Sequence, residues 1–168
     1  MQTEQRAAAI RFVILDVDGV LTDGRLYYGP EGEALKVFDV RDGHGIKLLM
    51  RSGIDVALLT ARSSPMVTAR ARELGISRVL QGQHDKAAGF AQLLADTGLQ
   101  ASVCAYMGDD LPDLPVLRQV GLAATVADAC EAVRQCAHWI SQAPGGRGAV
   151  RELAHMILQA QGQWTSHA

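Results

Sequence analysis

Short apolar runs alternate with amphipathic segments along most of the chain, and this alternation constrains the fold more than any other feature. The runs are rich in Val, Ile and Leu, and glycine or polar residues bound each of them, as expected of strands buried on both faces of a sheet. They cover Arg11–Val17, Ile54–Thr60, Arg78–Leu80, Val103–Met107 and Leu122–Val126. Strands that alternate with helices in this way form a parallel sheet.

Helix boundary signals mark the segments between these strands. A Ser-Pro pair at residues 64–65 opens one helix that Gly75 closes, Asp85 opens another that ends near Gly98, and Pro112 starts a third. We therefore predict an α/β fold, a Rossmann-like parallel sheet flanked by helices. Ligands of such sheets bind beyond the carboxyl ends of the strands.

Residues 25–40 depart from the alternation. The segment LYYGPEGEALKVF has two extended runs around a Gly-Pro-Glu-Gly turn, which predicts a β-hairpin projecting from the sheet. The length of 168 residues and the apolar fraction of 48% suit one domain with a real core. We expect residues 1–168 to form a single domain without a large cap.

Charge and cysteine usage narrow the classes of partner. A net charge of −2 provides no basic surface for nucleic acid or an acidic membrane, so a small molecule is the expected partner. The N-terminal MQTEQRAAAI is too polar for a signal peptide, and no run reaches the roughly 18 apolar residues of a membrane span. Cys104, Cys130 and Cys136 are odd in number and lack CxxC spacing. They therefore indicate reduced cysteines rather than a disulfide frame or a zinc site, and together with the N-terminus they agree with an expected cytoplasmic location.

Two aspartates end the first apolar run, in the sequence FVILDVDGVLTDG. Asp16 and Asp18 are two residues apart, so in a strand their side chains share one face. Such a pair needs a cation, a shared proton or a reaction that uses both groups. Aspartate can attack phosphorus as a nucleophile, and a second acid can protonate the leaving oxygen and later activate water. An acidic turn at the end of a strand is the alternative interpretation.

A second acidic group follows another predicted strand, in YMGDDLPDLPVL. Asp109, Asp110 and Asp113 offer the oxygen ligands that Mg²⁺ prefers, and a metal would relieve the repulsion between carboxylates. Asp109 is the predicted ligand because it lies nearest the strand end. Asp110 and Asp113 could instead cap the helix that begins near Pro112.

Two further residues suit a site for phosphate. Thr60 follows a strand in LLTAR, where its hydroxyl and nearby backbone N–H groups could hold a phosphoryl oxygen; a helix-capping or turn role is the alternative. Lys86 lies at the start of a helix, where positive charge is disfavoured. A buried anion would explain Lys86, and a solvated lysine is the alternative.

The motifs DVDGVLTDG, LLTAR, Lys86 and GDDLPDLPVL, in this order and spacing along the chain, resemble the four motifs of the haloacid dehalogenase superfamily of phosphatases. The resemblance implies that Asp16 is phosphorylated, that Asp18 acts as general acid and base, and that Thr60 and Lys86 hold the phosphoryl group. It also implies a Mg²⁺ site made by Asp16, Asp109 and the backbone carbonyl of Asp18. Ala61 stands where the family commonly has glycine, a departure that concerns only the fine shape of that turn.

Substrate and assembly are likewise inferred from the resemblance. It implies an eight-carbon 2-keto sugar acid phosphate used for bacterial lipopolysaccharide, with a nine-carbon analogue or a non-catalytic phosphosugar-binding module as alternatives. It implies a homotetramer in which Tyr27, Tyr28, Val37 and Phe38 of the hairpin form contacts and a neighbouring subunit completes the pocket. The predicted substrate-binding residues are Asp18, Asp39, Val40, Arg41, Asp42, Gly43, Lys47, Arg62, Arg70 and Lys86.

The segment APGGRGAVRELAHMIL near the C-terminus combines a glycine loop with an amphipathic helix. Val150, Leu153, Met156 and Ile157 recur at helical spacing and predict a packing face. The loop with Arg147 either packs with this helix or reaches an active site, because the family has a similar tail that closes over a neighbouring pocket.

Overall fold

The protein forms a parallel six-stranded sheet. The computed structural model describes residues 3–164. The strand order is β5-β4-β1-β6-β7-β8, and every pairing between these strands is parallel. The strands are β1 (Phe12–Leu15), β4 (Asp55–Leu59), β5 (Arg78–Leu80), β6 (Cys104–Met107), β7 (Leu122–Thr125) and β8 (Trp139–Ile140). All five predicted strands are therefore confirmed, and β8 is an additional edge strand of two residues.

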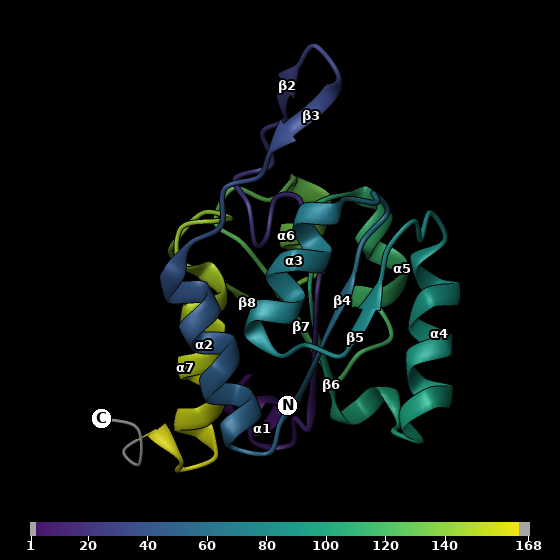
Figure 1. The fold of residues 1–168 in the computed structure, drawn as a ribbon. Coiled ribbons are helices and arrows are strands. Elements are labelled where there is room, and N and C mark those ends of the chain that lie inside the picture. The colour runs from purple at the N-terminus through teal and green to yellow at the C-terminus, as the bar shows by residue number, and fades with distance from the viewer. Residues whose placement is uncertain (1–2, 165–168) are drawn as a thin grey trace.

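Helices cover both faces of the sheet. In Figure 1, α2 and α7 lie together on one side, and α4 and α5 lie on the other. The α-helices are α1 (Thr3–Ala8), α2 (Val40–Arg51), α3 (Pro65–Leu74), α4 (Lys86–Thr97), α5 (Leu114–Leu117), α6 (Glu131–Cys136) and α7 (Ala149–Ala160), with 3-10 turns η1 (Ala101–Val103) and η2 (Leu111–Asp113). This arrangement confirms the predicted fold class.

The predicted boundary signals of α3 and α4 are correct. The Ser64 side chain accepts a hydrogen bond from Met66 N, and Gly75 ends α3 in the left-handed conformation with φ of 83°. Asp85 accepts from Ala88 N at the start of α4, and Gly98 ends that helix. The helix predicted to start at Pro112 is shorter than the other two, because η2 and the four-residue α5 divide it.

Helix α2 was not predicted, and its sequence contains two glycines, which disfavour helix. Both glycines lie where another part of the molecule approaches closely. A Cβ on Gly45 would lie 3.0 Å from the Arg151 Cα of α7, and one on Gly43 would lie 2.4 Å from Arg70 Nη2 of α3. Close packing of α2 therefore outweighs the low helix propensity of glycine. Asp39 caps this helix by accepting from Arg41 N.

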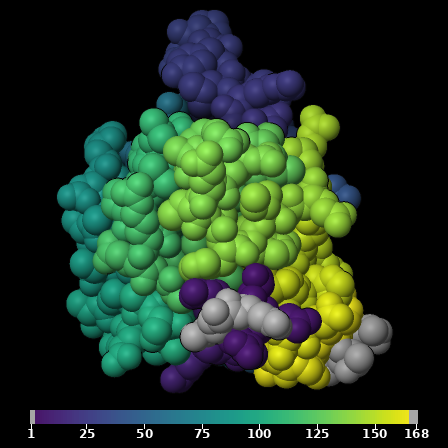
Figure 2. Space-filling model, turned by 180° about the vertical axis from the view of Figure 1, so that it is seen from behind, coloured from purple at the N-terminus to yellow at the C-terminus, as the bar shows by residue number. Residues whose placement is uncertain are grey.

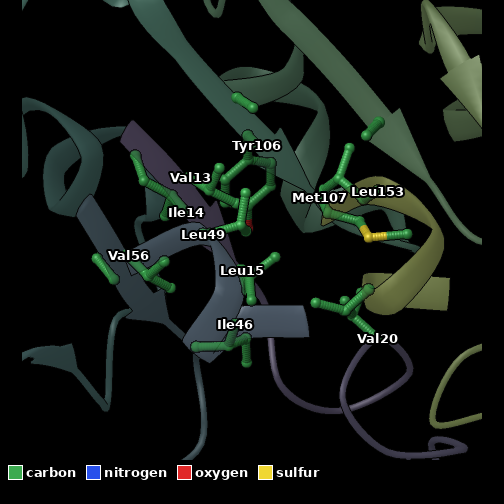
Figure 3. Packing of buried hydrophobic residues seen from close by; sticks show 14 of the residues in the cluster. Val13, Ile14, Leu15, Val20, Ile46, Leu49, Val56, Tyr106, Met107 and Leu153 are labelled. Carbon is green, nitrogen blue, oxygen red and sulfur yellow. The ribbon is translucent and has the colours of Figure 1, made fainter. Parts of the chain in front are cut away.

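The core lies between the sheet and its helices. Figure 3 shows side chains of β1 and β6 gathered with Ile46 and Leu49 of α2 and Leu153 of α7. Phe12, Ile14 and the other β1 side chains are fully buried, and each such side chain stabilises the fold by about 1.5–3 kcal/mol. On α7, Val150, Leu153 and Ile157 are buried and Met156 packs against the core, as the helical spacing predicted.

The predicted hairpin is confirmed. Strands β2 (Tyr27–Gly29) and β3 (Gly32–Leu35) pair antiparallel in a separate sheet. The hairpin projects from the body of the molecule in both Figure 1 and Figure 2. Within residues 3–164, no helix has the length and apolar character needed to cross a bilayer.

Candidate active site

Three neighbouring strands place the predicted chemical groups at one edge of the sheet. β1 lies between β4 and β6, and Asp16, Thr60 and Asp109 follow these strands by one or two residues. They meet at a cavity of about 260 Å³. Its lining residues are Asp16, Asp18, Gly24, Thr60, Ala61, Arg62, Lys86, Asp109, Asp110, Pro112 and Asp113. The structure thus brings together all five residues predicted to do chemistry.

Lys86 is the central cation of this cavity. It begins α4, yet only 4% of it is exposed, so the alternative of a solvated lysine is wrong. Its Nζ lies 2.8 Å from Asp16 Oδ2 and 2.5 Å from Asp113 Oδ1. Burial alone would lower the pKa of Lys86, but the two carboxylates raise it, so the side chain stays protonated. The buried anion expected beside Lys86 is therefore supplied first by the chain itself.

Asp113 holds the site together. Its buried carboxylate accepts hydrogen bonds from Lys86 Nζ at 2.5 Å, from the Tyr106 hydroxyl at 2.5 Å, and from the backbone N–H groups of Asp109 and Asp110 at 2.9 and 3.1 Å. Asp110 also accepts from Leu111 N, so both residues form the helix cap that was the alternative interpretation. With four donors, Asp113 fixes its neighbours and has little capacity left for another ligand.

Asp16 and Asp109 are carboxyl groups of the site whose pKa values are raised. Asp16, Asp109 and Asp113 each offer a carboxylate oxygen within 4.8 Å of the others. Burial, followed by repulsion from nearby carboxylates, raises the pKa of Asp16 to about 6 and that of Asp109 to about 7. Within residues 3–164, no group donates a hydrogen bond to the Asp109 carboxylate. These carboxylates fit a divalent cation, because hard cations take oxygen ligands and offset such repulsion.

Glycine at position 19 allows this close packing. A Cβ there would lie 2.1 Å from Asp109 Oδ2, and φ of +90° also favours glycine. The loop after β1 therefore lies directly against the carboxylate from β6. In this loop, Asp18 accepts a hydrogen bond from Lys36 of the hairpin at 2.5 Å, and Arg62 lies 3.8 Å away.

Thr60 is buried at the end of β4, and its backbone N–H donates to Leu80 O. Ser64, not Thr60, caps α3, so the capping alternative for Thr60 is wrong. The Thr60 residue lines the cavity beside Ala61 and Arg62, as the prediction of a phosphoryl-binding position requires.

Most of the predicted substrate-binding residues lie outside this cavity. Asp42 is buried and accepts from Gly148 N and Arg151 N of the C-terminal segment, and Arg41 pairs with Asp39 and donates to Arg147 O. A separate cavity of about 160 Å³ has Val40, Gly43, His44, Lys47, Arg70, Glu73 and Leu74 as its lining. Substrate contact by these residues stays a prediction.

The C-terminal glycine loop packs against the loop that carries Asp18. Gly146 N donates to Val20 O at 2.8 Å, and a Cβ on Gly145 would lie 1.8 Å from Gly19 O. These glycines therefore pack within the chain, and contact of the Arg147 loop with an active site stays a prediction. Lys36 and Tyr106 are the site residues that sequence reasoning missed, because their contacts with Asp18 and Asp113 depend on tertiary packing.

Comparison with known proteins agrees with this geometry. Residues 27–121, more than half of the chain, match the family model of haloacid dehalogenase-like hydrolases. This chain belongs to the haloacid dehalogenase-like hydrolase family. The predicted superfamily is therefore confirmed, and the matched part of this hydrolase includes Thr60, Lys86 and Asp109.

Relatives of this hydrolase share most of its length. The 3-deoxy-D-manno-octulosonate 8-phosphate phosphatase of Yersinia pestis is 51% identical over 157 residues, covering 94% of this chain and 84% of the relative. The enzyme of the same name from Escherichia coli K12 is 46% identical, with the same coverage. A crystal structure of such a phosphatase from Moraxella catarrhalis, in complex with magnesium ion, phosphate ion and KDO, matches with a TM-score of 0.96 and 44% identity. The match covers 98% of this chain and 95% of that one.

Proposed function

We propose that this hydrolase removes phosphate from 3-deoxy-D-manno-octulosonate 8-phosphate and releases the free sugar acid for lipopolysaccharide precursor synthesis. The observation that carries the proposal is the meeting of Asp16, Asp18, Thr60, Lys86 and Asp109 in one cavity. This set supplies a nucleophile, an acid/base group, phosphate ligands and metal ligands. The relatives named 3-deoxy-D-manno-octulosonate 8-phosphate phosphatase, at 46–51% identity, support the choice of substrate.

The chemistry begins at Asp16. Its carboxylate attacks phosphorus, the bond from phosphorus to the sugar oxygen breaks, and Asp18 gives that oxygen a proton. Asp18 then removes a proton from water, which attacks the same phosphorus, so phosphate leaves and Asp16 is regenerated. Thr60 and Lys86 hold the phosphoryl oxygens. Lys86 also keeps the Asp16 carboxylate in place through its contact of 2.8 Å.

Mg²⁺ would be held by the carboxylates of Asp16 and Asp109 and the backbone carbonyl of Asp18, and when bound it neutralises negative charge on the transferring group. Within residues 3–164, no donor reaches the Asp18 carbonyl oxygen, so this oxygen is available as a ligand. Phosphoryl transfer depends chiefly on such positioning and charge neutralisation.

We also infer that the chain is one capless domain that assembles as a homotetramer. One continuous core cluster supports the single domain. The cavity of about 260 Å³ is small for an eight-carbon sugar phosphate, so part of the sugar lies outside it. A second subunit would complete the walls of the substrate pocket, and Arg41 and Lys47 of α2 would then contact the substrate.

We propose a cytoplasmic location as well. The three cysteines are free thiols, and burial raises the pKa of Cys104 to about 11, so this thiol stays protonated and unreactive. Thiols without a disulfide role are typical of a reducing compartment.

Phosphate release from a set of sugar phosphates, with Mg²⁺, tests the proposed function. The set includes the eight-carbon substrate, a nine-carbon keto-deoxy sugar acid 9-phosphate and simple hexose phosphates. We expect fast release from the eight-carbon substrate and none from Asp16→Asn. Preference for the nine-carbon compound would make that compound the substrate instead. Binding without phosphate release from any compound would mean a phosphosugar-binding module.

A further inference from the structure

The hairpin places a lysine with a nearly inaccessible side chain beside the acid/base aspartate. Lys36 follows β3 directly, and its side chain is only 1% exposed. Its Nζ lies 2.5 Å from Asp18 Oδ1 and 2.8 Å from Glu33 Oε1, so one ammonium joins the active-site loop to the hairpin. Fixing a lysine side chain has an entropic cost, which these charged contacts must offset.

Arg62 lies near both carboxylates of this group. Its Nε lies 3.8 Å from Asp18 Oδ2 and its Nη2 lies 3.6 Å from Glu33 Oε1. Two cations and two carboxylates therefore alternate around a ring, with Asp18 between Lys36 and Arg62. The arginine distances are too long for hydrogen bonds.

Lys36 is therefore the specific partner of the Asp18 side chain. Within residues 3–164, it alone donates a hydrogen bond to the Asp18 carboxylate. Lys86, the other lysine of the site, forms ion pairs with Asp16 and Asp113. Each of the two aspartates that the proposed reaction needs thus has its own ammonium, and the two lysines come from different elements, the hairpin and α4.

We propose that Lys36 is a positioning residue, which orients the Asp18 carboxylate for proton transfer and so couples the hairpin to catalysis within the same chain. This inference rests on the proposed function. Glu33 contributes by holding the Lys36 ammonium at the end of β3. Without Lys36, Asp18 keeps only the distant Arg62 guanidinium and can adopt other rotamers, so fewer encounters have the proton donor in place.

Steady-state kinetics of Lys36→Met, Lys36→Arg and a control variant test the proposal. The control is Arg25→Met, which removes another cation near the hairpin, 73% exposed and 3.9 Å from Asp23. We expect Lys36→Met to lower kcat by about tenfold or more, because misplaced acid/base groups cost factors of this size. KM should change by less than about threefold, since the loss falls on the chemical step. Lys36→Arg should recover part of kcat, and Arg25→Met should match the parent.

A double-mutant cycle with Asp18→Asn separates positioning from folding or assembly. If Lys36 acts through Asp18, adding Lys36→Met to Asp18→Asn should lower the residual rate by less than about twofold. The same fold loss in both backgrounds would overturn the proposal, as would an unchanged kcat in Lys36→Met. An inactive parent protein would instead refute the proposed function, so the two failures are distinguishable.

Discussion

At the scale of single residues, neighbouring carboxylates of the site repel one another, and a bound cation would relieve this repulsion at neutral pH. Asp16 has Lys86 as a partner, but the Asp109 carboxylate receives no hydrogen bond from residues 3–164 and lies against Gly19. The folded protein therefore holds both carboxyl groups at raised pKa values, about 6 and about 7. The group most costly to the metal-free fold is the one best placed to bind Mg²⁺.

This repulsion predicts how stability depends on pH. Both folded-state pKa values exceed the ordinary 3.8, so between about pH 4 and pH 7 the folded protein binds more protons than the unfolded chain. These two groups therefore make the metal-free protein less stable as pH rises through that window. Mg²⁺ needs the deprotonated groups, so the rise in Tm on adding Mg²⁺ should be larger at pH 7.5 than at pH 5.0. Equal rises at both values would contradict this account.

A substitution at Asp109 checks the same prediction without a pH change. Asp109→Asn should increase the metal-free free energy of unfolding at pH 7.5 by about 1–3 kcal/mol, because it removes an unpaired, partly buried charge. The variant should also lose the Mg²⁺-induced rise in Tm. Asp110→Asn, at an exposed neighbour, is the matched control and should change stability by less than about 0.5 kcal/mol. Urea unfolding followed by tryptophan fluorescence measures the stability changes of the two variants. Thermal unfolding with and without Mg²⁺ measures the rise in Tm.

At this scale, the sequence identified residues at strand ends better than it identified their partners. Asp16, Thr60 and Asp109 were predictable because carboxyl ends of neighbouring parallel strands must meet. Lys36 was not, because it acts across the hairpin, and the contacts of Asp113 with Lys86 and Tyr106 were not, because these come from two other elements. Such pairings depend on tertiary packing, which no local pattern contains.

At the scale of elements, the C-terminal glycine loop packs against the loop after β1. Gly145→Ala should push these loops apart, because its Cβ would lie 1.8 Å from Gly19 O. We expect a loss of about 1–3 kcal/mol in the free energy of unfolding, together with a lower kcat. Gly53→Ala is the control: nothing lies within 4 Å of its Cβ, so only the positive φ is strained. A Gly145→Ala variant with the parent's stability and kcat would refute this role of the loop.

Element boundaries were predictable wherever capping residues specify them. Ser64, Gly75, Asp85 and Gly98 mark α3 and α4 correctly because each satisfies end groups or adopts the conformation that a helix end requires. α2 escaped prediction because Gly43 and Gly45 serve tight packing against α3 and α7, which is not visible in the sequence.

At the scale of the whole molecule, the projecting hairpin exposes apolar side chains that a partner subunit would cover. Leu26, Leu35 and Val37 are each more than 40% exposed. Light scattering should show four copies for the parent protein at micromolar concentration. Leu35→Glu should reduce both the mass of the assembly in solution and kcat, because burial of a charge in an interface is unfavourable. Ile140→Glu, an exposed apolar residue of edge strand β8, should keep the parent mass. A parent protein that is monomeric would contradict the tetramer.

The most direct test of the central claim is to trap the phosphorylated protein. The parent protein is mixed with Mg²⁺ and 3-deoxy-D-manno-octulosonate 8-phosphate, quenched in acid during the first turnover and digested with trypsin. Cleavage after Arg11 and Arg25 releases the peptide Phe12–Arg25, which mass spectrometry can fragment. We expect one phosphoryl group on Asp16 and none in Asp16→Asn. Rapid phosphate release with this peptide unmodified, or modified at Asp18, would contradict this expectation.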